Sequence, residues 1–161
     1  MERKKIKKNW LEFERACRLI ADYIENLEHD NKYIYGISRG GFPIATYVSN
    51  LLNIPMVHST QELTDKLRPN FGNDSILIIV DDICDSGDTL ESKATKFLKN
   101  PLIQCVSTAV WYHRDNNVHT PDFHVEIIPK KLWIVFPWER GEERSIGKKD
   151  RSEVGRERYQ K

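Results

Sequence analysis

The feature that most constrains the fold is the run from Ile76 to Val80, which consists of five consecutive apolar residues. A short apolar run without polar interruption is typical of a strand that is buried on both faces, as in a parallel sheet covered by helices. A Ser-Gly-Asp-Thr turn follows, and then a helical pattern that includes Lys93, Ala94 and Phe97. We therefore predict a strand, a glycine-containing turn and a helix over residues 76–98.

The same order of elements occurs earlier in the chain. The β-prone run Tyr33–Ile37 is followed by Ser-Arg-Gly-Gly and by a helical pattern over residues 42–52. Before it, apolar residues recur every three or four positions from Trp10 to Leu27, which indicates a helix with one buried face. Short strands are also expected at residues 53–58, 106–112, 123–127 and 132–136. With residues 59–75 as a mobile loop or a small hood, the pattern predicts an α/β fold with a largely parallel central sheet flanked by helices.

Length and composition limit the number of domains and the classes of partner that we expect for the chain. Its 161 residues fit one domain, which we place at residues 1–139, and the many charged side chains of residues 140–161 predict a solvated tail or a frayed helix. With 25 Lys and Arg against 24 Asp and Glu, the charge of +1 gives no reason to expect nucleic acid or an anionic membrane as a partner. Three cysteines without C-x-x-C spacing fit reduced thiols, and no apolar stretch is long enough for a membrane span. We therefore expect a cytoplasmic protein.

Two adjacent aspartates, Asp81 and Asp82, stand directly after the buried strand. Like charges this close repel each other, so we expect a bound group that compensates them. A ribose diol or a hydrated Mg2+ would do so, because carboxylates accept hydroxyl protons and ligate this ion. In the turn that follows, free backbone N–H groups at a helix start and side-chain hydroxyls make residues 86–89 a candidate phosphate site. The alternative is that Ser86 or Asp88 only caps the helix.

These residues carry a resemblance. The segment ILIIVDDICDSGDT resembles the phosphoribosyl pyrophosphate (PRPP) signature of type I phosphoribosyltransferases, and YIYGISRGGFPIATYVSNLLNIP is similar to the strand, pyrophosphate loop and helix of the bacterial xanthine-guanine and hypoxanthine enzymes. WIVFPWE resembles their purine-binding segment, and NWLEFERACRLIADYI resembles their first helix. The resemblance covers roughly residues 8–140. It implies the type I phosphoribosyltransferase fold and Mg2+-dependent transfer of ribose 5-phosphate from PRPP to a purine, with release of pyrophosphate.

The resemblance also implies a role for each motif. Asp81 and Asp82 would divide contacts to the ribose hydroxyls and to Mg2+ between them, and Asp85 would act as a general base or acid near N7 of the purine. The loop for the 5-phosphate of PRPP would be Asp85, Ser86, Gly87, Asp88 and Thr89. The loop for pyrophosphate would be Ser38, Arg39, Gly40 and Gly41. The family often has a non-proline cis peptide bond in this loop, which here would be Ser38–Arg39.

The purine end of the site would be formed by Trp133, which would stack on the base, and by Ile134, whose backbone would face the base edge. A lone tryptophan in a strand is otherwise more often a core residue. Relatives also carry a lysine that contacts the purine 6-oxo group, whereas this chain has WYHRD, with His113 or Arg114 nearest. If His113 takes that place, its protonation would strengthen the hydrogen bond and give a dependence near about pH 6 to 7.

From these patterns we expect an enzyme of nucleotide salvage that acts on hypoxanthine, guanine or xanthine and forms a homo-oligomer, either a dimer or a tetramer. Two alternatives stay open. One is a PRPP-sensing regulator that keeps the fold without the catalysis and binds RNA, DNA or a partner through its basic ends. The other is a transferase for another nucleobase, because a fold alone does not decide the substrate.

Overall fold

The computed structural model describes residues 4–68, 74–115 and 119–139 of the chain. Its main sheet has four parallel strands in the order β2-β3-β4-β5. These strands are β2 (Asn31–Gly36), β3 (Ser75–Cys84), β4 (Cys105–Arg114) and β5 (Phe123–Ile128). The predicted parallel α/β sheet is therefore confirmed, and β3 lies inside it between β2 and β4.

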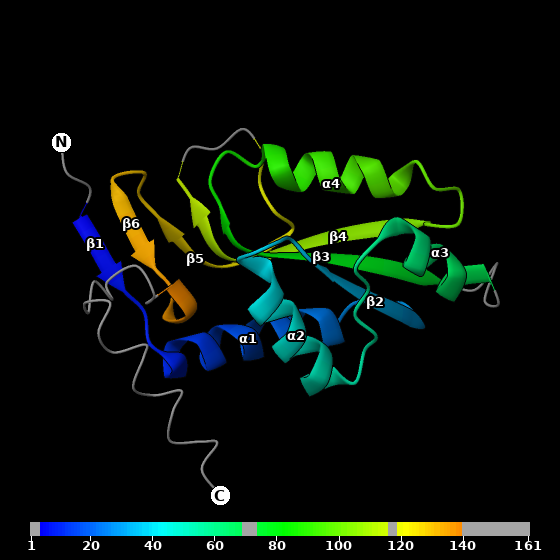
Figure 1. The fold of residues 1–161 in the computed structure, drawn as a ribbon, viewed down its shortest axis with the longest axis horizontal. Coiled ribbons are helices and arrows are strands. Elements are labelled where there is room, and N and C mark those ends of the chain that lie inside the picture. Colours follow the sequence, from blue (N-terminus) through cyan, green and yellow to red (C-terminus); the bar gives the residue numbers. More distant parts are fainter. Residues whose placement is uncertain (1–3, 69–73, 116–118, 140–161) are drawn as a thin grey trace, which may run out of the picture.

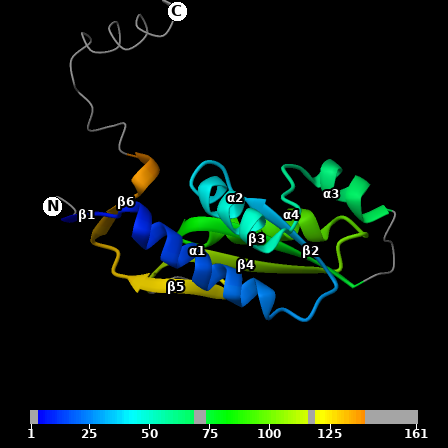
Figure 2. The ribbon, with the colours of Figure 1, turned by 90° about the horizontal axis from the view of Figure 1, so that it is seen from below.

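Helices cover both faces of this sheet (Figure 1). They are α1 (Trp10–Glu25), α2 (Gly41–Leu52), α3 (Thr60–Leu67) and α4 (Asp88–Leu98). Figure 2 shows α1 and α2 crossing in front of the strands, on the face opposite α4. Side chains of β3 alternate between two cores, with Ile78 packed in the core of α1 and α2 and Ile79 in the core of α3 and α4. The apolar run of β3 is explained by this arrangement, because successive side chains of a strand point to opposite faces.

The first helix begins where its sequence provides a cap. Asn9 accepts a hydrogen bond from the backbone N–H of Glu12, and the Glu12 carboxylate accepts one from the backbone N–H of Asn9. This reciprocal pair satisfies two backbone donors that a helix start otherwise leaves free. Downstream, the predicted apolar face is buried in the core, with Cys17, Ile20 and Ile24 fully enclosed.

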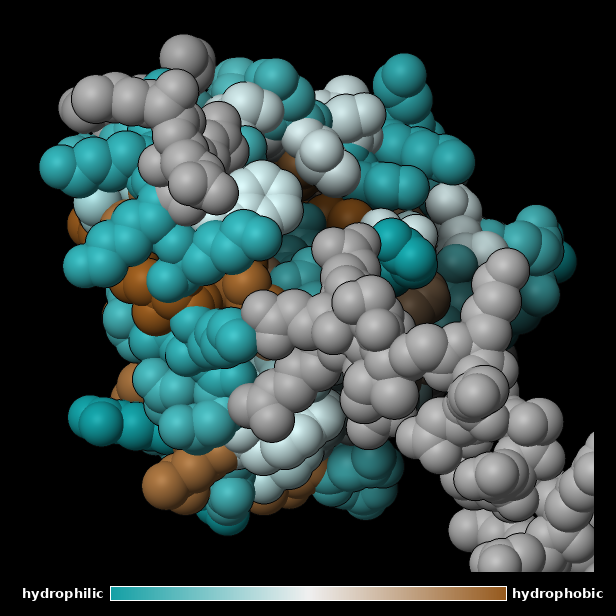
Figure 3. All heavy atoms as spheres, turned by 60° about the vertical axis from the view of Figure 1, so that its left-hand side comes forward, coloured by the Kyte–Doolittle hydropathy of each residue, from teal (hydrophilic) through white to brown (hydrophobic). Residues whose placement is uncertain are grey.

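A second, two-stranded sheet lies beside the main one and pairs β1 (Lys4–Lys7) with β6 (Leu132–Val135) in parallel. The strand predicted at residues 132–136 is confirmed as β6, but it lies in this second sheet, and β1 was not predicted. A 3-10 turn, Pro137–Glu139, follows β6. Figure 3 shows this side of the molecule, where hydrophilic side chains dominate and hydrophobic ones form separate patches.

Two further segments differ from the sequence prediction. Residues 53–58 form no strand, because their sheet pairing is limited to a single bridge between Ile34 and Met56. Within residues 59–75, which were predicted as a loop or hood, the chain forms α3, capped by Ser59. Leu63 and Leu67 of α3 are buried in the core beside α4, so the segment belongs to the helical layer. The predicted tail, residues 140–161, lies outside the described residues.

Among the described residues, no helix is both long and apolar enough to cross a membrane. Cys17, Cys84 and Cys105 are free thiols, as the absence of C-x-x-C spacing predicted. Burial raises the pKa of the Cys17 thiol to about 12, which keeps this thiol protonated in the core.

Candidate functional site

The two adjacent aspartates lie within the sheet, because β3 continues past Val80 as far as Cys84. Asp81 pairs in register with Val110 of β4, and Asp82 is only 9% exposed. The apolar run thus ends before the strand does. Pairing with β4 holds the acidic residues in a fixed extended backbone at the carboxyl end of the sheet, where ligands bind in parallel α/β folds.

The Ser-Arg-Gly-Gly loop leaves β2 beside these acids. Ile37 donates a backbone hydrogen bond to the carbonyl of Val80 (2.9 Å), which ties the loop to the residue before Asp81. The peptide bond Ser38–Arg39 is cis, as the resemblance implied. A side chain at Gly40 would overlap the carboxylate of Asp82, so only glycine permits this close approach. The structure therefore brings the predicted pyrophosphate loop and the acidic pair together.

Burial strongly affects the electrostatics of the acidic pair. The pKa of Asp81 is raised above its ordinary value, first by burial and then by the negative charge of Asp82. Burial also raises the pKa of Asp82, and the negative charge of Glu139 adds to this effect. A pair that resists double ionisation is a site that a bound cation would stabilise.

The donor set of this site fits Mg2+. No group of three or more His, Cys, Asp or Glu side chains that could hold a metal occurs in the described part of the chain. Two carboxylates suit Mg2+, because this ion is commonly held by one or two carboxylates while substrate phosphates and water complete its shell. Glu139 was not singled out in the sequence beyond its place at the end of WIVFPWE, since its position near Asp82 depends on the turn after β6.

The phosphate-loop residues form a tight turn into α4. Gly87 has φ +91°, a backbone conformation that favours glycine, and α4 starts at Asp88. The hydroxyl of Ser86 donates to Asp88 Oδ2 (2.8 Å), and the backbone N–H of Asp88 donates to Ser86 Oγ (3.3 Å). Ser86 and Asp88 thus hold the turn in its shape, while Thr89 is exposed at the helix start. This geometry is compatible with both predictions for the turn, that it starts the helix and that it binds a phosphate.

The acid of this loop, Asp85, has a buried partner on β4. Arg114 Nε lies 2.6 Å from Asp85 Oδ1, and the side chain of Asp85 is 69% exposed. Because the guanidinium of Arg114 also binds backbone carbonyls below the surface, Arg114 is not a free group at the purine position. Of the two residues predicted nearest the 6-oxo group, Arg114 thus has partners within the protein.

The predicted purine-binding residues lie on β6. The side chain of Trp133 is 47% exposed, whereas Ile134 is only 5% exposed and packs in the core of α1 and α2. The indole is thus not enclosed in the core, where a lone tryptophan in a strand more often lies. His113, near the end of β4, is only 6% exposed, and its ring centroid lies 5.3 Å from that of His124.

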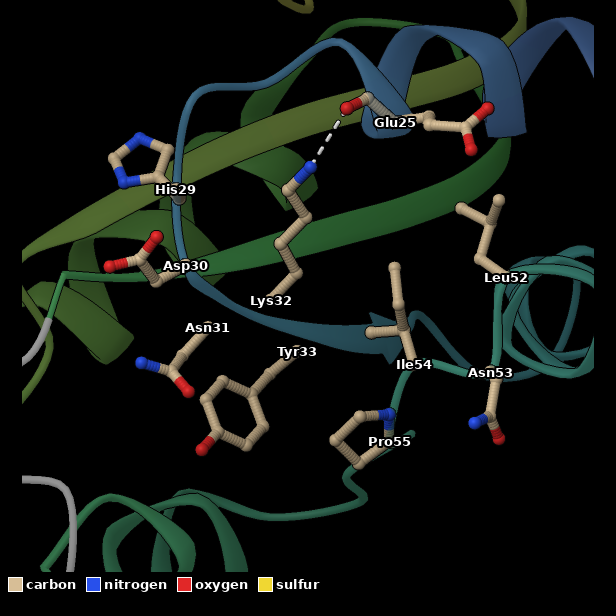
Figure 4. A pocket seen from close by; sticks show the side chains of 10 residues that line it. All are labelled: Glu25, His29, Asp30, Asn31, Lys32, Tyr33, Leu52, Asn53, Ile54 and Pro55. Carbon is tan, nitrogen blue, oxygen red and sulfur yellow. Dashed lines mark hydrogen bonds between the residues drawn. The ribbon is translucent and has the colours of Figure 1, made fainter.

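A cavity of about 380 Å3 lies away from this site (Figure 4). Its lining comes from the end of α1, the start of β2 and the segment after α2: Glu25, His29, Asp30, Asn31, Lys32, Tyr33, Leu52, Asn53, Ile54 and Pro55. All strands of the sheet are parallel, so the amino end of β2 lies at the opposite end of the sheet from Asp81 and Asp82. The ammonium of Lys32 donates to the carbonyl of Glu25 (2.9 Å) and satisfies the end of α1. The candidate site is therefore defined by its chemistry and not by this cavity.

Comparison with known proteins decides the family. Residues 2–143 match the phosphoribosyl transferase domain. The chain belongs to the phosphoribosyltransferase family. Curated relatives include the xanthine-guanine phosphoribosyltransferases of Idiomarina loihiensis (30% identity over 145 residues) and Cereibacter sphaeroides (26% over 147 residues). Each alignment covers 81% of this chain and 84% of the relative.

Solved structures agree on the architecture of this phosphoribosyltransferase. A purine phosphoribosyltransferase from Pyrococcus horikoshii has 25% identity and a TM-score of 0.66, covering 84% of this chain and 94% of that one. The xanthine-guanine-hypoxanthine phosphoribosyltransferase of Helicobacter pylori has the same TM-score at 15% identity and covers 86% of this chain and 96% of its own, which shows the fold alone. The type I phosphoribosyltransferase fold inferred from the motifs is confirmed.

Burial changes the expected pH behaviour of His113 in this phosphoribosyltransferase. Its pKa is lowered from the ordinary 6.5, first by burial and then by the charge of His124. A histidine whose pKa falls on folding costs stability as pH drops below its ordinary pKa, because the unfolded chain then binds more protons. The predicted activity change near about pH 6 to 7 should accordingly move to lower pH.

We expect His113→Asn to reduce the loss of melting temperature between about pH 7 and pH 5, because the variant has no imidazole to protonate there. Thermal unfolding of parent and variant across this range measures the effect. His58→Asn is the control, since His58 is exposed and should leave the pH dependence unchanged. If His113→Asn and the parent lose the same melting temperature between these pH values, His113 does not become easier to protonate on unfolding.

Proposed function

We propose that the protein transfers the ribose 5-phosphate group from PRPP to a nitrogen of a 6-oxopurine, with hypoxanthine, guanine or xanthine as the base, and releases pyrophosphate in nucleotide salvage. The observation that carries the proposal is the packing of Gly40 against the Asp82 carboxylate. This contact joins a glycine loop suited to an anion to an acidic pair suited to ribose hydroxyls and a divalent cation. Enzymes named for xanthine and guanine among the curated relatives support the choice of base.

The residues divide the reaction between them. Backbone groups of the loop Ser38–Gly41 would bind the departing pyrophosphate, and the start of α4 would hold the 5-phosphate, since free N–H groups at a helix start favour anions. Asp81 and Asp82 would hold the ribose hydroxyls and Mg2+. When bound, Mg2+ would neutralise the charge that develops on the leaving pyrophosphate. Asp85, exposed beside the phosphate loop, would exchange a proton with the purine.

The base would be recognised at the far end of this arrangement. Trp133 would stack on its face, because an exposed indole can pair with any purine by its π-surface. Ile134 would bind the base edge through its backbone. His113 would donate to the 6-oxo group as a neutral imidazole, because its pKa is lowered.

We also propose that the enzyme works as a homo-oligomer in the cytoplasm. Trp10 and Leu11 at the start of α1 are 55% and 75% exposed, and burial of such side chains is a common driving force for association. Free cysteines at three positions fit a reducing compartment. Light scattering of the purified protein tests the first statement.

The proposal is tested by incubating the protein with PRPP, Mg2+ and one nucleobase at a time while pyrophosphate release is followed. Hypoxanthine, guanine and xanthine are expected to be substrates, and adenine, uracil and orotate are expected to react at least about tenfold more slowly. Equal use of adenine would contradict the 6-oxopurine assignment. No release with any base, combined with PRPP binding, would favour a PRPP-sensing regulator.

A further inference from the structure

Arg114 is the last residue of β4, and its side chain is only 5% exposed. An arginine is almost never buried to this extent unless its charge and its five N–H donors have partners. The partners of Arg114 come from two other segments, the β5–β6 turn and the loop after β3. A buried charge at this junction needs a reason beyond filling space.

The first set of partners is a group of backbone carbonyls. Arg114 Nη1 lies 3.2 Å from the carbonyl oxygen of Pro129, 3.3 Å from that of Lys130 and 2.8 Å from that of Leu132. These residues form the turn between β5 and β6, and Leu132 directly precedes Trp133. Arg114 therefore fixes the backbone from which the purine-stacking side chain projects.

The second partner is Asp85. Arg114 Nε lies 2.6 Å from Asp85 Oδ1, but the N–H is not aligned for a hydrogen bond, so the contact is an ion pair. One partner is buried and the other is largely exposed. The carboxylate is thus attracted to a rigidly held cation while its other oxygen remains open to solvent and to a ligand.

We propose that Arg114 is a positioning residue that holds the Asp85 carboxylate and the Trp133 segment in one fixed arrangement around the purine. The inference rests on the proposed function, in which Asp85 exchanges a proton with the base. Through Arg114, a single buried guanidinium sets the distance between the proton-transfer group and the stacking platform. Asp85 is the only member of the proposed phosphate and pyrophosphate loops that Arg114 pairs with among the described residues.

A purely structural role and a positioning role for Arg114 lead to different expected kinetics. Arg114→Gln keeps a polar but shorter side chain and removes the charge and most donors. We expect kcat with hypoxanthine or guanine to fall about tenfold, while KM for PRPP changes less than about twofold, because the partners of Arg114 do not include Ser38–Gly41 or Ser86–Thr89. Arg114→Lys restores the charge beside Asp85 and should recover part of kcat.

A double-mutant cycle with Asp85→Asn separates the two explanations. If Arg114 acts in part through Asp85, the double variant should lose less kcat than the two single variants combined, because one of the two groups that Arg114 positions is already lost. Ser107→Ala is the matched control. Ser107 lies on β4 like Arg114, and its hydroxyl bonds to that of Tyr23 in α1 (2.8 Å), so its loss should lower the melting temperature without changing kcat.

The outcomes are distinct. Additive losses in the cycle, an Arg114→Gln variant with kcat within twofold of the parent, or a lysine variant no better than the glutamine variant would each overturn the positioning role. A parent protein that is inactive with every base would overturn the proposed function, and this inference with it. Should Arg114→Gln fail to fold, the comparison of Arg114→Lys with the parent, with and without Asp85→Asn, gives the same test.

Discussion

Replacing Asp81 and Asp82 together by asparagine is expected to lower transferase activity about 100-fold or more while the fold is retained. The pair lies at the carboxyl end of β3, with Asp82 buried and Asp81 half-buried, and would hold Mg2+ and the ribose hydroxyls. Amides ligate Mg2+ far more weakly than carboxylates. The measurement is pyrophosphate release with PRPP and saturating base. Near-normal turnover in the double variant would remove these acids from the mechanism.

The same variant should be more stable than the parent in neutral and alkaline solution without ligands. Folding raises the pKa of both carboxyls above the ordinary 3.8. A carboxyl of this kind contributes stability at low pH and loses it as pH rises through its folded-state pKa, so the ionised pair is a cost at high pH. The gain in melting temperature should therefore be larger at about pH 8 than at about pH 5, with about 2–4 °C for each kcal/mol relieved.

Asp30→Asn is the control for both measurements. Asp30 is an exposed acid before β2, at the opposite end of the sheet from the acidic pair. Its replacement should change neither the activity nor the pH dependence of unfolding. A stability gain of the double variant that is equal at both pH values would show that removal of charge is not its cause.

Gly40→Ala is expected to lower kcat/KM for PRPP about 100-fold. The new methyl group would overlap the Asp82 carboxylate, so either Asp82 or the loop that follows the Ser38–Arg39 peptide must move. A displacement of about 1 Å between binding groups is enough for a loss of this size. Steady-state kinetics with PRPP as the varied substrate measure the effect.

Gly36→Ala is the matched control for this substitution. A side chain there would also be too close to its surroundings, at 2.9 Å from Ala45 Cβ and 3.0 Å from the carbonyl oxygen of Gly41, but Asp82 is not among its nearest contacts. We expect it to lower the melting temperature and to reduce kcat/KM much less than Gly40→Ala does. If the two variants lose stability and activity in the same proportion, the effect of Gly40→Ala reflects packing rather than the site.

Much of this protein is determined by local sequence. The apolar run of β3, the spacing of apolar residues in α1 and the cap formed by Asn9 each depend on residues within a few positions of one another, so their structure follows from short-range pattern. The motif residues are also local: strand, acids and glycine turn follow each other directly from Ile76 to Thr89. For this reason the composition of the candidate site could be predicted before its geometry.

The helix α3 shows where local pattern was present but too weak. Ser59 accepts a hydrogen bond from the backbone N–H of Glu62, the Glu62 carboxylate accepts one from the backbone N–H of His58, and both are visible as a capping pattern in the sequence. Only Leu63 and Leu67 are buried, which is a single apolar pair in a polar segment. A helix this short is stabilised by packing against the sheet, and that contribution is not encoded in its own residues.

Tertiary structure alone decided the features that join distant segments. The Lys-rich β1 forms a strand because it pairs with β6, where Lys4 lies opposite Leu132. No periodicity in Lys4–Lys7 could indicate this pairing. Likewise, WYHRD names two basic residues without showing that His113 is buried against His124 or that Arg114 binds Asp85 and the β5–β6 turn. Sequence determined which chemical groups the site contains, because they follow one another along the chain. Tertiary structure decided which of these groups contact each other, because the sheet brings together residues that are far apart in the sequence.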